Sequence, residues 1–139
     1  DTSFVFQVWA SARRAAILPK GYLHYRVDNA NSSVKSSAKV FAVCDEYELS
    51  REFLAKDPEK QRAFGAIVNL LKLGTYRWNF NRLTDESRRA FAERMREEYL
   101  RAREEGTLDR DMFAPADWEM LNLMMDDFDA FMARVELGM

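Results

Sequence analysis

The residues of this chain that could do chemistry lie near its start. Asp1 and the hydroxyl residues Thr2 and Ser3 stand directly before an apolar run that begins at Phe4. A carboxylate at a helix N-terminus is stabilised by the free backbone N–H groups there. His24 and Arg26 share the polar side of an alternating segment that leads into the stretch DNANSS at 28–33. An arginine beside hydroxyl and amide groups is typical of an anion site. Asp1 has a plainer alternative, in which it only caps a helix.

Other catalytic arrangements have weaker support. The chain holds 5 glycines, which are scattered singly and form no phosphate-binding loop. One histidine, His24, and one cysteine, Cys44, cannot build a usual zinc site. A Cys44–His24 nucleophile pair stays open, although a buried structural cysteine on a helical stripe is the commoner outcome.

Two short acidic patterns resemble metal-binding motifs, namely Asp109-Arg110-Asp111 and the group 126–129. Asp127 and Asp129 fall on an expected helix, about 200° apart around its axis, so they cannot easily converge on one ion. Asp109 and Asp111 fall in an expected loop, where they would cap the next element. We therefore expect no metal site in this chain.

The elements that position Asp1, His24 and Arg26 form a small α/β piece. Its expected parts, in order, are a helix over 2–13, a strand over 15–18, a Pro-Lys-Gly turn, a second strand over 22–27 and a polar loop over 28–37. A β-hairpin alone is marginal in water. We therefore expect that the helices cover it or that it belongs to a larger sheet.

The rest of the chain, 38–139, has helical periodicity throughout and predicts a bundle of about four helices. The expected helices run over 38–56, from Pro58 with Asp57 as cap, from Thr84 to Gly106, and from Pro115 to near the end. Gly74 is expected to end or bend the second one, which should turn Phe64, Ile67, Val68 and Leu71 inward. Phe91, Met95 and Leu100 form the stripe of the third. The fold class is thus mainly α, with domains over 1–37 and 38–139.

The last helix carries the clearest amphipathic pattern. Its apolar positions, spaced by three and four residues, are Trp118, Leu121, Met125, Phe128, Met132 and Val135. This stripe is expected to be intramolecular core, with a homodimer seam as the alternative. The run of arginines and glutamates over 93–105 predicts a solvated face with pairs such as Glu97–Arg101.

The composition and net charge limit the class of protein and the partners that this chain can have. Apolar residues make up 47% and charged residues 32% of the chain, which is typical of a globular protein. A net charge of −2 argues against a nucleic-acid partner, because phosphate binding needs a clustered positive surplus. A single cysteine suits a reducing compartment.

The stretch DTSFVFQVWASARRAAILPKGYLHYRVDNANSSV resembles the end of the catalytic domain of bacterial family 2 glycosyltransferases, which are inverting enzymes with the GT-A fold. The segment 1–4 matches the second half of the family's acidic motif. The later Tyr-x-Tyr-Arg segment and polar loop are matched by Tyr22, Tyr25, Arg26, Ser32 and Ser33. The stretches KVFAVCDEYELSREFLAKDPE and YRWNFNRL resemble the helical C-terminal extension of the capsule and cell-wall polysaccharide members.

The resemblance implies that Asp1 is the catalytic base, which takes the proton from the acceptor hydroxyl. The resemblance also places Arg26, together with His24 and Ser33, near the donor diphosphate. The glutamate that precedes the aspartate in the family is not present, nor is the nucleotide-binding half with its metal motif. A divalent cation, Mg²⁺ or Mn²⁺, is expected for the whole enzyme and no cofactor for this part.

Two hypotheses follow. In the first, the chain is the C-terminal part of a glycosyltransferase whose partners are a nucleotide sugar and a glycan acceptor; alone it is inactive. That protein would be cytoplasmic, with association at the inner face of the membrane and homodimer formation left open. In the second, the chain is a free-standing helical protein–protein interaction module. A small unrelated enzyme using Asp1, His24 and Arg26 is a more distant alternative.

Overall fold

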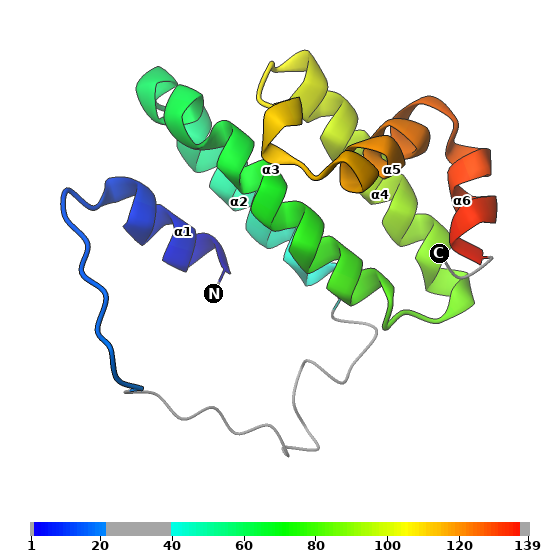
Figure 1. Cartoon of the computed structure of the whole chain (residues 1–139), viewed down its shortest axis with the longest axis horizontal. Coiled ribbons are helices and arrows are strands. Elements are labelled where there is room, and N and C mark those ends of the chain that lie inside the picture. Colours follow the sequence, from blue (N-terminus) through cyan, green and yellow to red (C-terminus); the bar gives the residue numbers. More distant parts are fainter. Residues whose placement is uncertain (1, 22–39, 137–139) are drawn as a thin grey trace.

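The computed structural model describes residues 2–21 and 40–136, and this part is built from α-helices. The helices are α1 (Thr2–Ser11), α2 (Ala42–Ala55), α3 (Pro58–Phe80), α4 (Asp85–Glu104), α5 (Pro115–Asp126) and α6 (Phe128–Glu136), with a 3₁₀ turn, η3, at Arg110–Met112. Each helix packs mainly on its neighbours in the chain, and α5 and α6 lie on the side of α4 away from α2 (Figure 1). The prediction of a mainly helical bundle is confirmed.

The β-hairpin is the part of the fold prediction that fails. Residues 15–18, expected as its first strand, are exposed coil in the structure. A strand needs a partner for its backbone groups, and the described residues offer none beside this segment. The expected second strand over 22–27 and the domain boundary at residue 37 lie outside the described residues.

Helix α3 begins as the sequence predicts. The side chain of Asp57 accepts hydrogen bonds from the backbone N–H groups of Glu59 and Lys60 at 3.1 and 3.2 Å, and Pro58 takes the first helical position. The expected end or bend at Gly74 is wrong, because α3 continues to Phe80. A glycine costs a helix only about 1 kcal/mol, and the packed residues Leu73 and Tyr76 hold the helix on either side of it.

The face that α3 buries also differs from the prediction. Val68 is buried as expected, and Phe64 is half-buried, but Ile67 and Leu71 are 37% and 52% exposed. The buried face instead contains Asn69 and Lys72. The buried face predicted from the apolar periodicity is therefore turned by about one residue around α3 from the face that the structure buries.

The core lies where α2, α3 and α4 meet. Tyr76, Phe91 and Tyr99 are fully buried there. The ring of Tyr76 meets those of Tyr47 and Phe91 edge to face, with centroids 5.5 and 5.4 Å apart, the arrangement that aromatic quadrupoles favour. Phe91 and Met95 are on the buried stripe of α4 as predicted. The chain leaves α4 through Gly106, whose φ of 67° suits glycine.

The expected single C-terminal helix is two helices, α5 and α6, divided at Asp127. This residue has an extended φ of −141°, and its carboxylate accepts from the N–H of Ala130 at 3.0 Å. Aspartate competes well with helix continuation because its side chain caps backbone donors. Arg96 of α4 donates through Nε and Nη2 to the carbonyl oxygen of Met125, each at 3.1 Å. That carbonyl lies at the end of α5, so α4 holds the break in place.

The apolar stripe of the last helix survives this break. Leu121, Met125 and Met132 are 2%, 1% and 7% exposed and belong to the core of the same chain. The prediction of an intramolecular core is confirmed for these positions.

Replacing Asp127 with alanine should destabilise the protein by about 1 kcal/mol, because α6 loses the acceptor for its first turn. The measurement is urea unfolding followed by circular dichroism. Asp129→Ala is the matched control, because Asp129 is a surface residue of α6 whose ion pair with Arg89 is exposed. Equal losses in the two variants would contradict the capping role of Asp127.

Candidate functional site

The four residues that the sequence singles out for chemistry are not described by the structure. Asp1, His24, Arg26 and Ser33 all lie outside residues 2–21 and 40–136. Their mutual geometry is therefore untested, and their assigned roles remain predictions. The described part contains two other features that bear on function: a buried polar network and an exposed apolar surface.

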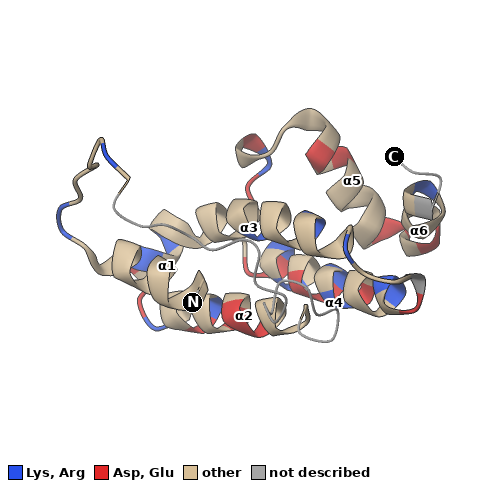
Figure 2. Cartoon of the chain, turned by 90° about the horizontal axis from the view of Figure 1, so that it is seen from below, with Lys and Arg blue, Asp and Glu red and all other residues tan. Residues whose placement is uncertain are grey.

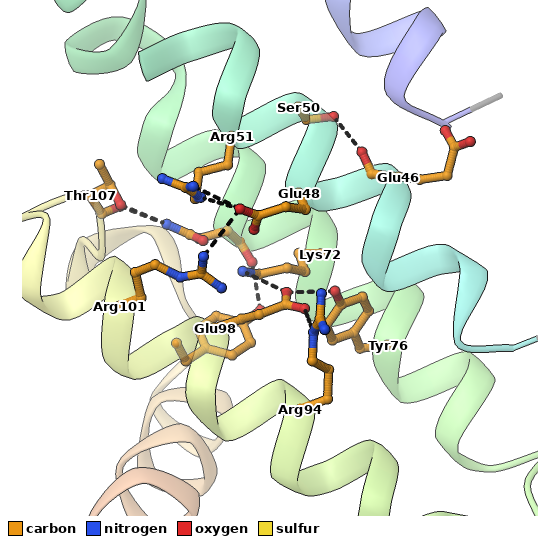
Figure 3. A network of polar contacts seen from close by, with 12 residues as sticks. Glu46, Glu48, Ser50, Arg51, Lys72, Tyr76, Arg94, Glu98, Arg101 and Thr107 are labelled. Atoms are coloured by element: carbon orange, nitrogen blue, oxygen red, sulfur yellow. Dashed lines mark hydrogen bonds and ion pairs between the residues drawn. The ribbon is translucent and has the colours of Figure 1, made fainter.

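The buried network is centred on an ion pair between α3 and α4. Lys72 Nζ lies 3.4 Å from Glu98 Oε2, and the two side chains are only 7% and 3% exposed. The ammonium group also lies 4.6 Å from the centroid of the Tyr99 ring, a cation–π distance. Desolvation lowers the pKa of Lys72, while the nearby carboxylate of Glu98 opposes that shift. Figure 3 shows these side chains meeting between the helices.

Glu98 is satisfied by more than one donor. The hydroxyl of Tyr76 donates to Oε2 at 2.6 Å, and Nε of Arg94 donates to Oε1 at 2.8 Å. Both carboxylate oxygens are therefore occupied by partners from α3 and from α4 itself. A buried charge that is paired and hydrogen-bonded in this way is tolerated, whereas an isolated one is not.

A second set of ion pairs joins α2 to α4 above this centre. Glu48 Oε1 accepts from Arg51 Nη2 at 2.7 Å and from Arg101 Nη1 at 3.1 Å. Arg51 also reaches Glu105 at 2.8 Å. The predicted solvated face of α4 is therefore only partly right, since Arg101 crosses to the neighbouring helix α2.

The turn after α4 closes the same region from one end. Asn69 Nδ2 donates to the carbonyl oxygen of Thr107 at 3.0 Å, and the hydroxyl of Tyr99 donates to the carbonyl oxygen of Asn69 at 2.8 Å. Gly65 makes this approach feasible, because a Cβ at that position would lie 3.0 Å from Thr107 Cγ2. A side chain larger than hydrogen would push this turn away from α3.

The cavity enclosed by these groups is too small for a substrate. Its volume is about 30 Å³, and Glu48, Arg51, Asn69, Lys72 and Arg101 are among the residues that line it. This space holds a water molecule, not a sugar ring. The arrangement can fix α2, α3 and α4 relative to one another, and we assign it that structural role.

Cys44 lies beside this network and is 2% exposed. Burial raises the pKa of its thiol to about 11, although a hydrogen bond with Tyr76 works against that shift. A thiol with this pKa is protonated near neutral pH and is a poor nucleophile. The structure thus favours the buried structural cysteine over the Cys44–His24 pair, of which His24 lies outside the described residues.

The two acidic patterns have structural partners. Asp109 accepts from the N–H of Asp111 at 3.0 Å and so caps η3, as predicted. Asp126 pairs with Arg103, and Asp129 pairs with Arg89. Within residues 2–21 and 40–136, no group of three or more His, Cys, Asp or Glu side chains is placed to hold a metal ion.

The apolar surface is the second feature, and it begins on α1. Four large side chains of this helix, Phe4, Val5, Val8 and Trp9, are 71%, 51%, 52% and 58% exposed. We call these four residues the outer face of α1. The side of α1 that faces the bundle carries the buried small residues Ser3 and Ala10 and the half-buried Phe6.

Helix α1 is nevertheless seated specifically on α2. The backbone N–H of Ser3 donates to Glu46 Oε2 at 2.8 Å, and this hydrogen bond lowers the pKa of the Glu46 carboxyl. At the same helix, the ring of Phe6 meets that of Phe64 in α3 edge to face at 6.4 Å. The orientation that turns the large residues of α1 outward is therefore fixed by contacts on its other side.

Apolar exposure is confined to one part of the molecule. The large apolar side chains that are exposed in the described residues all lie between Phe4 and Trp78, and none lies on α4, α5 or α6. Charged residues are dense along α4 and are also present on α2, as Figure 2 shows. The outer face of α1 and the surface of α4 thus differ in chemistry.

Little in the sequence indicates the buried network. Lys72 stands in an apolar stretch, and Glu98 stands in a run of charged residues that is typical of a solvated helix. A weak signal existed in the spacing of Val68, Lys72 and Tyr76 at intervals of four, which puts the lysine on a face with core residues. Only its pairing with Glu98 makes that position acceptable.

Comparison with models of known families, with curated proteins and with solved structures finds no match to this chain. Among the helices of the described residues, none combines the length and apolar character needed to cross a membrane.

Glu98→Gln should destabilise the protein by about 3–5 kcal/mol, because it leaves the Lys72 ammonium buried without a counter-charge. Denaturant unfolding at neutral pH measures this loss. Adding Lys72→Met to Glu98→Gln should restore much of the stability, since the orphaned charge is then removed. As a control, Glu93→Gln removes an exposed partner of Arg89 on the same helix and should change stability little. A Glu98→Gln protein as stable as the control would contradict the network's role.

Stability should fall with rising pH between about pH 9 and 11 through Cys44. Its pKa is 9.0 in the unfolded chain and about 11 in the folded one, so folding is favoured below pH 9 and this contribution is lost as the pH approaches 11. Two pKa units correspond to about 3 kcal/mol. Cys44→Ser removes the titrating thiol, and the difference between the two unfolding free energies should shrink over this range. Parallel curves for the two proteins would contradict the prediction.

Proposed function

We propose that this chain is the C-terminal part of an inverting glycosyltransferase of family 2, and that its helical bundle supports the last elements of the catalytic domain. The enzyme class is proposed from the resemblance of residues 1–33 to family 2 glycosyltransferases. The observation that carries the proposal structurally is the outer face of α1, the helix that follows Asp1.

The outer face of α1 is the reverse of what a helix at the edge of a finished domain presents. An amphipathic helix normally buries its large apolar side chains and exposes its polar ones. Here Ser3 and Ala10 are buried, whereas Phe4 and Trp9 are among the most exposed large side chains described. Contiguous apolar exposure of this kind marks a surface that another structure covers. The α/β catalytic domain of a GT-A enzyme would provide that cover.

The bundle is suited to support a catalytic domain because ion pairs hold its central helices in place. The pair Lys72–Glu98 joins α3 to α4 in the interior, and the partly exposed pair Glu48–Arg101 joins α2 to α4. Glu46 of α2 holds the N-terminal turn of α1. A displacement of α2 would therefore move α1 and, with it, the position of Asp1. Catalysis requires a general base held within hydrogen-bond reach of the acceptor hydroxyl.

In the proposed reaction, Asp1 takes the proton from the acceptor hydroxyl as that oxygen attacks the anomeric carbon of the donor sugar. The nucleoside diphosphate leaves with the bonding electron pair, and the configuration at the anomeric carbon inverts. Arg26 is assigned to the leaving diphosphate because a guanidinium pairs well with phosphate oxygens. His24 and Ser33 are assigned to the same region. A divalent cation bound by the nucleotide-binding half would share that charge.

The same outer face of α1 favours a second candidate, a helical module that binds another protein. In that case the apolar surface is covered by a separate partner, and Asp1 is only a helix cap. The two candidates differ in whether Asp1 has a chemical role, which an activity measurement decides.

The experiment uses the polypeptide encoded by the complete reading frame that contains this chain. With a panel of nucleotide sugars and a glycan acceptor extract, it should release nucleoside diphosphate, and Asp1→Asn should lower kcat by about 10²–10⁴-fold. The 139-residue chain alone should show no transfer. Turnover by the chain alone, or full activity of the Asp1→Asn protein, would contradict the proposal.

Two further variants separate chemistry from docking. Asp111→Asn changes an exposed acid far along the chain and should leave kcat unchanged. Trp9→Glu should leave the stability of the 139-residue chain unchanged, because Trp9 is 58% exposed. In the complete polypeptide it should lower both stability and activity, because the outer face of α1 is then buried. No effect of Trp9→Glu in the complete polypeptide would remove the structural support for the proposal.

A further inference from the structure

A cleft of about 430 Å³ lies where α3, α4, α5 and α6 meet. This volume falls within the range of small-molecule sites, about 300–1,000 Å³. Both α5 and α6 contribute to the wall because the chain turns between them at Asp127, so that α6 runs at an angle to α5 (Figure 1). The buried residues of the wall are all apolar, namely Leu73, Phe80, Met95, Leu121, Met124 and Phe131. The cleft therefore offers apolar surroundings to a ligand.

The charged residues that line the cleft are two arginines and one aspartate, which give it a net charge of +1. Arg77 of α3 is paired with Asp117 of α5. Arg134 of α6 donates through Nη1 to Oε1 of Glu119 at 2.7 Å. Nε of Arg134 is buried and has no hydrogen-bond partner among the described residues. The cleft thus combines apolar walls with a buried cationic donor whose partner the described part of the chain does not supply.

The Nε–H group of Arg134 calls for an acceptor. A buried donor without one destabilises a fold, and nearly all buried donors in native proteins have a partner. Glu119 is bonded at Nη1, whereas Nε lies on the other edge of the guanidinium, beside Nη2. That edge matches the two oxygens of a carboxylate, which can accept two parallel hydrogen bonds from it. A bound carboxylate would therefore satisfy the donor that the fold leaves unpaired.

We propose that the cleft between α3, α4, α5 and α6 is a binding site for a small organic monocarboxylate with an apolar body. The body lies among the apolar residues of the wall, and the carboxylate accepts from Nε of Arg134. The described residues that line the cleft include none of the proposed catalytic set, so the inference does not depend on the proposed function.

The charges at the cleft select this class of ligand over others. A neutral apolar molecule would leave the Nε–H of Arg134 unpaired, and an organic cation would be repelled by two arginines. A second acidic group on the ligand would lie near Asp117, which also lines the cleft. The wall is more permissive, because the flexible thioether chains of Met95, Met120 and Met124 adapt to apolar bodies of different shape.

The first test is calorimetric titration of the 139-residue chain with octanoate at neutral pH. The dissociation constant should be on the order of 100 µM for a ligand of this size. Butyrate has the same head with little body, and 1-octanol has the body without the charge, so each should bind about 10-fold more weakly or less well still. Octanoate should also raise Tm, because a ligand that binds only the folded state stabilises it.

The methionine methyl groups report where octanoate binds. The chain contains 7 methionines, of which Met95, Met120 and Met124 line the cleft. In a protein with isotope-labelled methionine methyl groups, octanoate should shift the NMR signals of these three residues. The signal of Met112 in η3, which does not line the cleft, should stay in place.

Two variants separate the head of the ligand from its body. Arg134→Met should weaken octanoate binding about 10-fold or more and leave the binding of 1-octanol unchanged. Arg110→Met is the matched control, because it removes the same charge from an η3 side chain that is 61% exposed. Ala116→Phe places a ring in the cleft from an exposed position of α5 and should abolish the binding of both compounds. Ala90→Phe, at an exposed position of α4 outside the cleft, should bind octanoate as the unchanged protein does.

Three results would overturn the proposal. The first is the absence of saturable octanoate binding at about 1 mM, well above the expected dissociation constant. The second is equal affinity for octanoate and 1-octanol, which would show that the carboxylate is not recognised. The third is octanoate binding that persists in Ala116→Phe and leaves the cleft methionines unshifted, which would place the ligand on another surface such as the outer face of α1.

Discussion

The buried ion pair between Lys72 and Glu98 is the interaction on which the rest of this bundle depends. It takes a lysine in the middle of α3 out of water, which is costly, and offsets that cost with a carboxylate that is also bonded to Tyr76 and Arg94. Because the lysine must face α4, the rotation of α3 about its axis is fixed. The apolar residues Ile67 and Leu71, which lie on a neighbouring face of α3, then point outward. A core assembled by apolar burial alone would have favoured a face of α3 turned by about one residue from this one.

That rotation leaves apolar side chains of α3 at the surface, and α1 exposes apolar side chains as well. Along α4, arginines cross between helices to carboxylates and to the end of α5, and the surface is densely charged (Figure 2). Charged groups remain well solvated at a surface, while exposed apolar groups favour contact with other apolar surfaces. The outer face of α1 is therefore better suited to contacts than the surface of α4.

The proposed enzyme role uses the outer face of α1. Helix α1 is held at one end by Glu46 of α2, so the outer face of α1 can be covered by a domain of the same polypeptide without strain in the bundle.

The sequence by itself determined the helices, their caps and much of the core. Asp57 and Pro58 start α3, Gly106 ends α4, and the stripe containing Phe91 and Met95 is buried, because capping and periodicity are local properties of the chain. It did not determine the break at Asp127, where a side-chain bond to Ala130 competes with a well-formed apolar period. It also missed the orientation of α3, which depends on a pairing between residues 72 and 98 that no local pattern contains. The tertiary structure decided the orientation of α3, because a buried charge is acceptable solely where the fold brings its partner. It also supports the break at Asp127 through Arg96 of α4, which donates to the carbonyl oxygen of Met125.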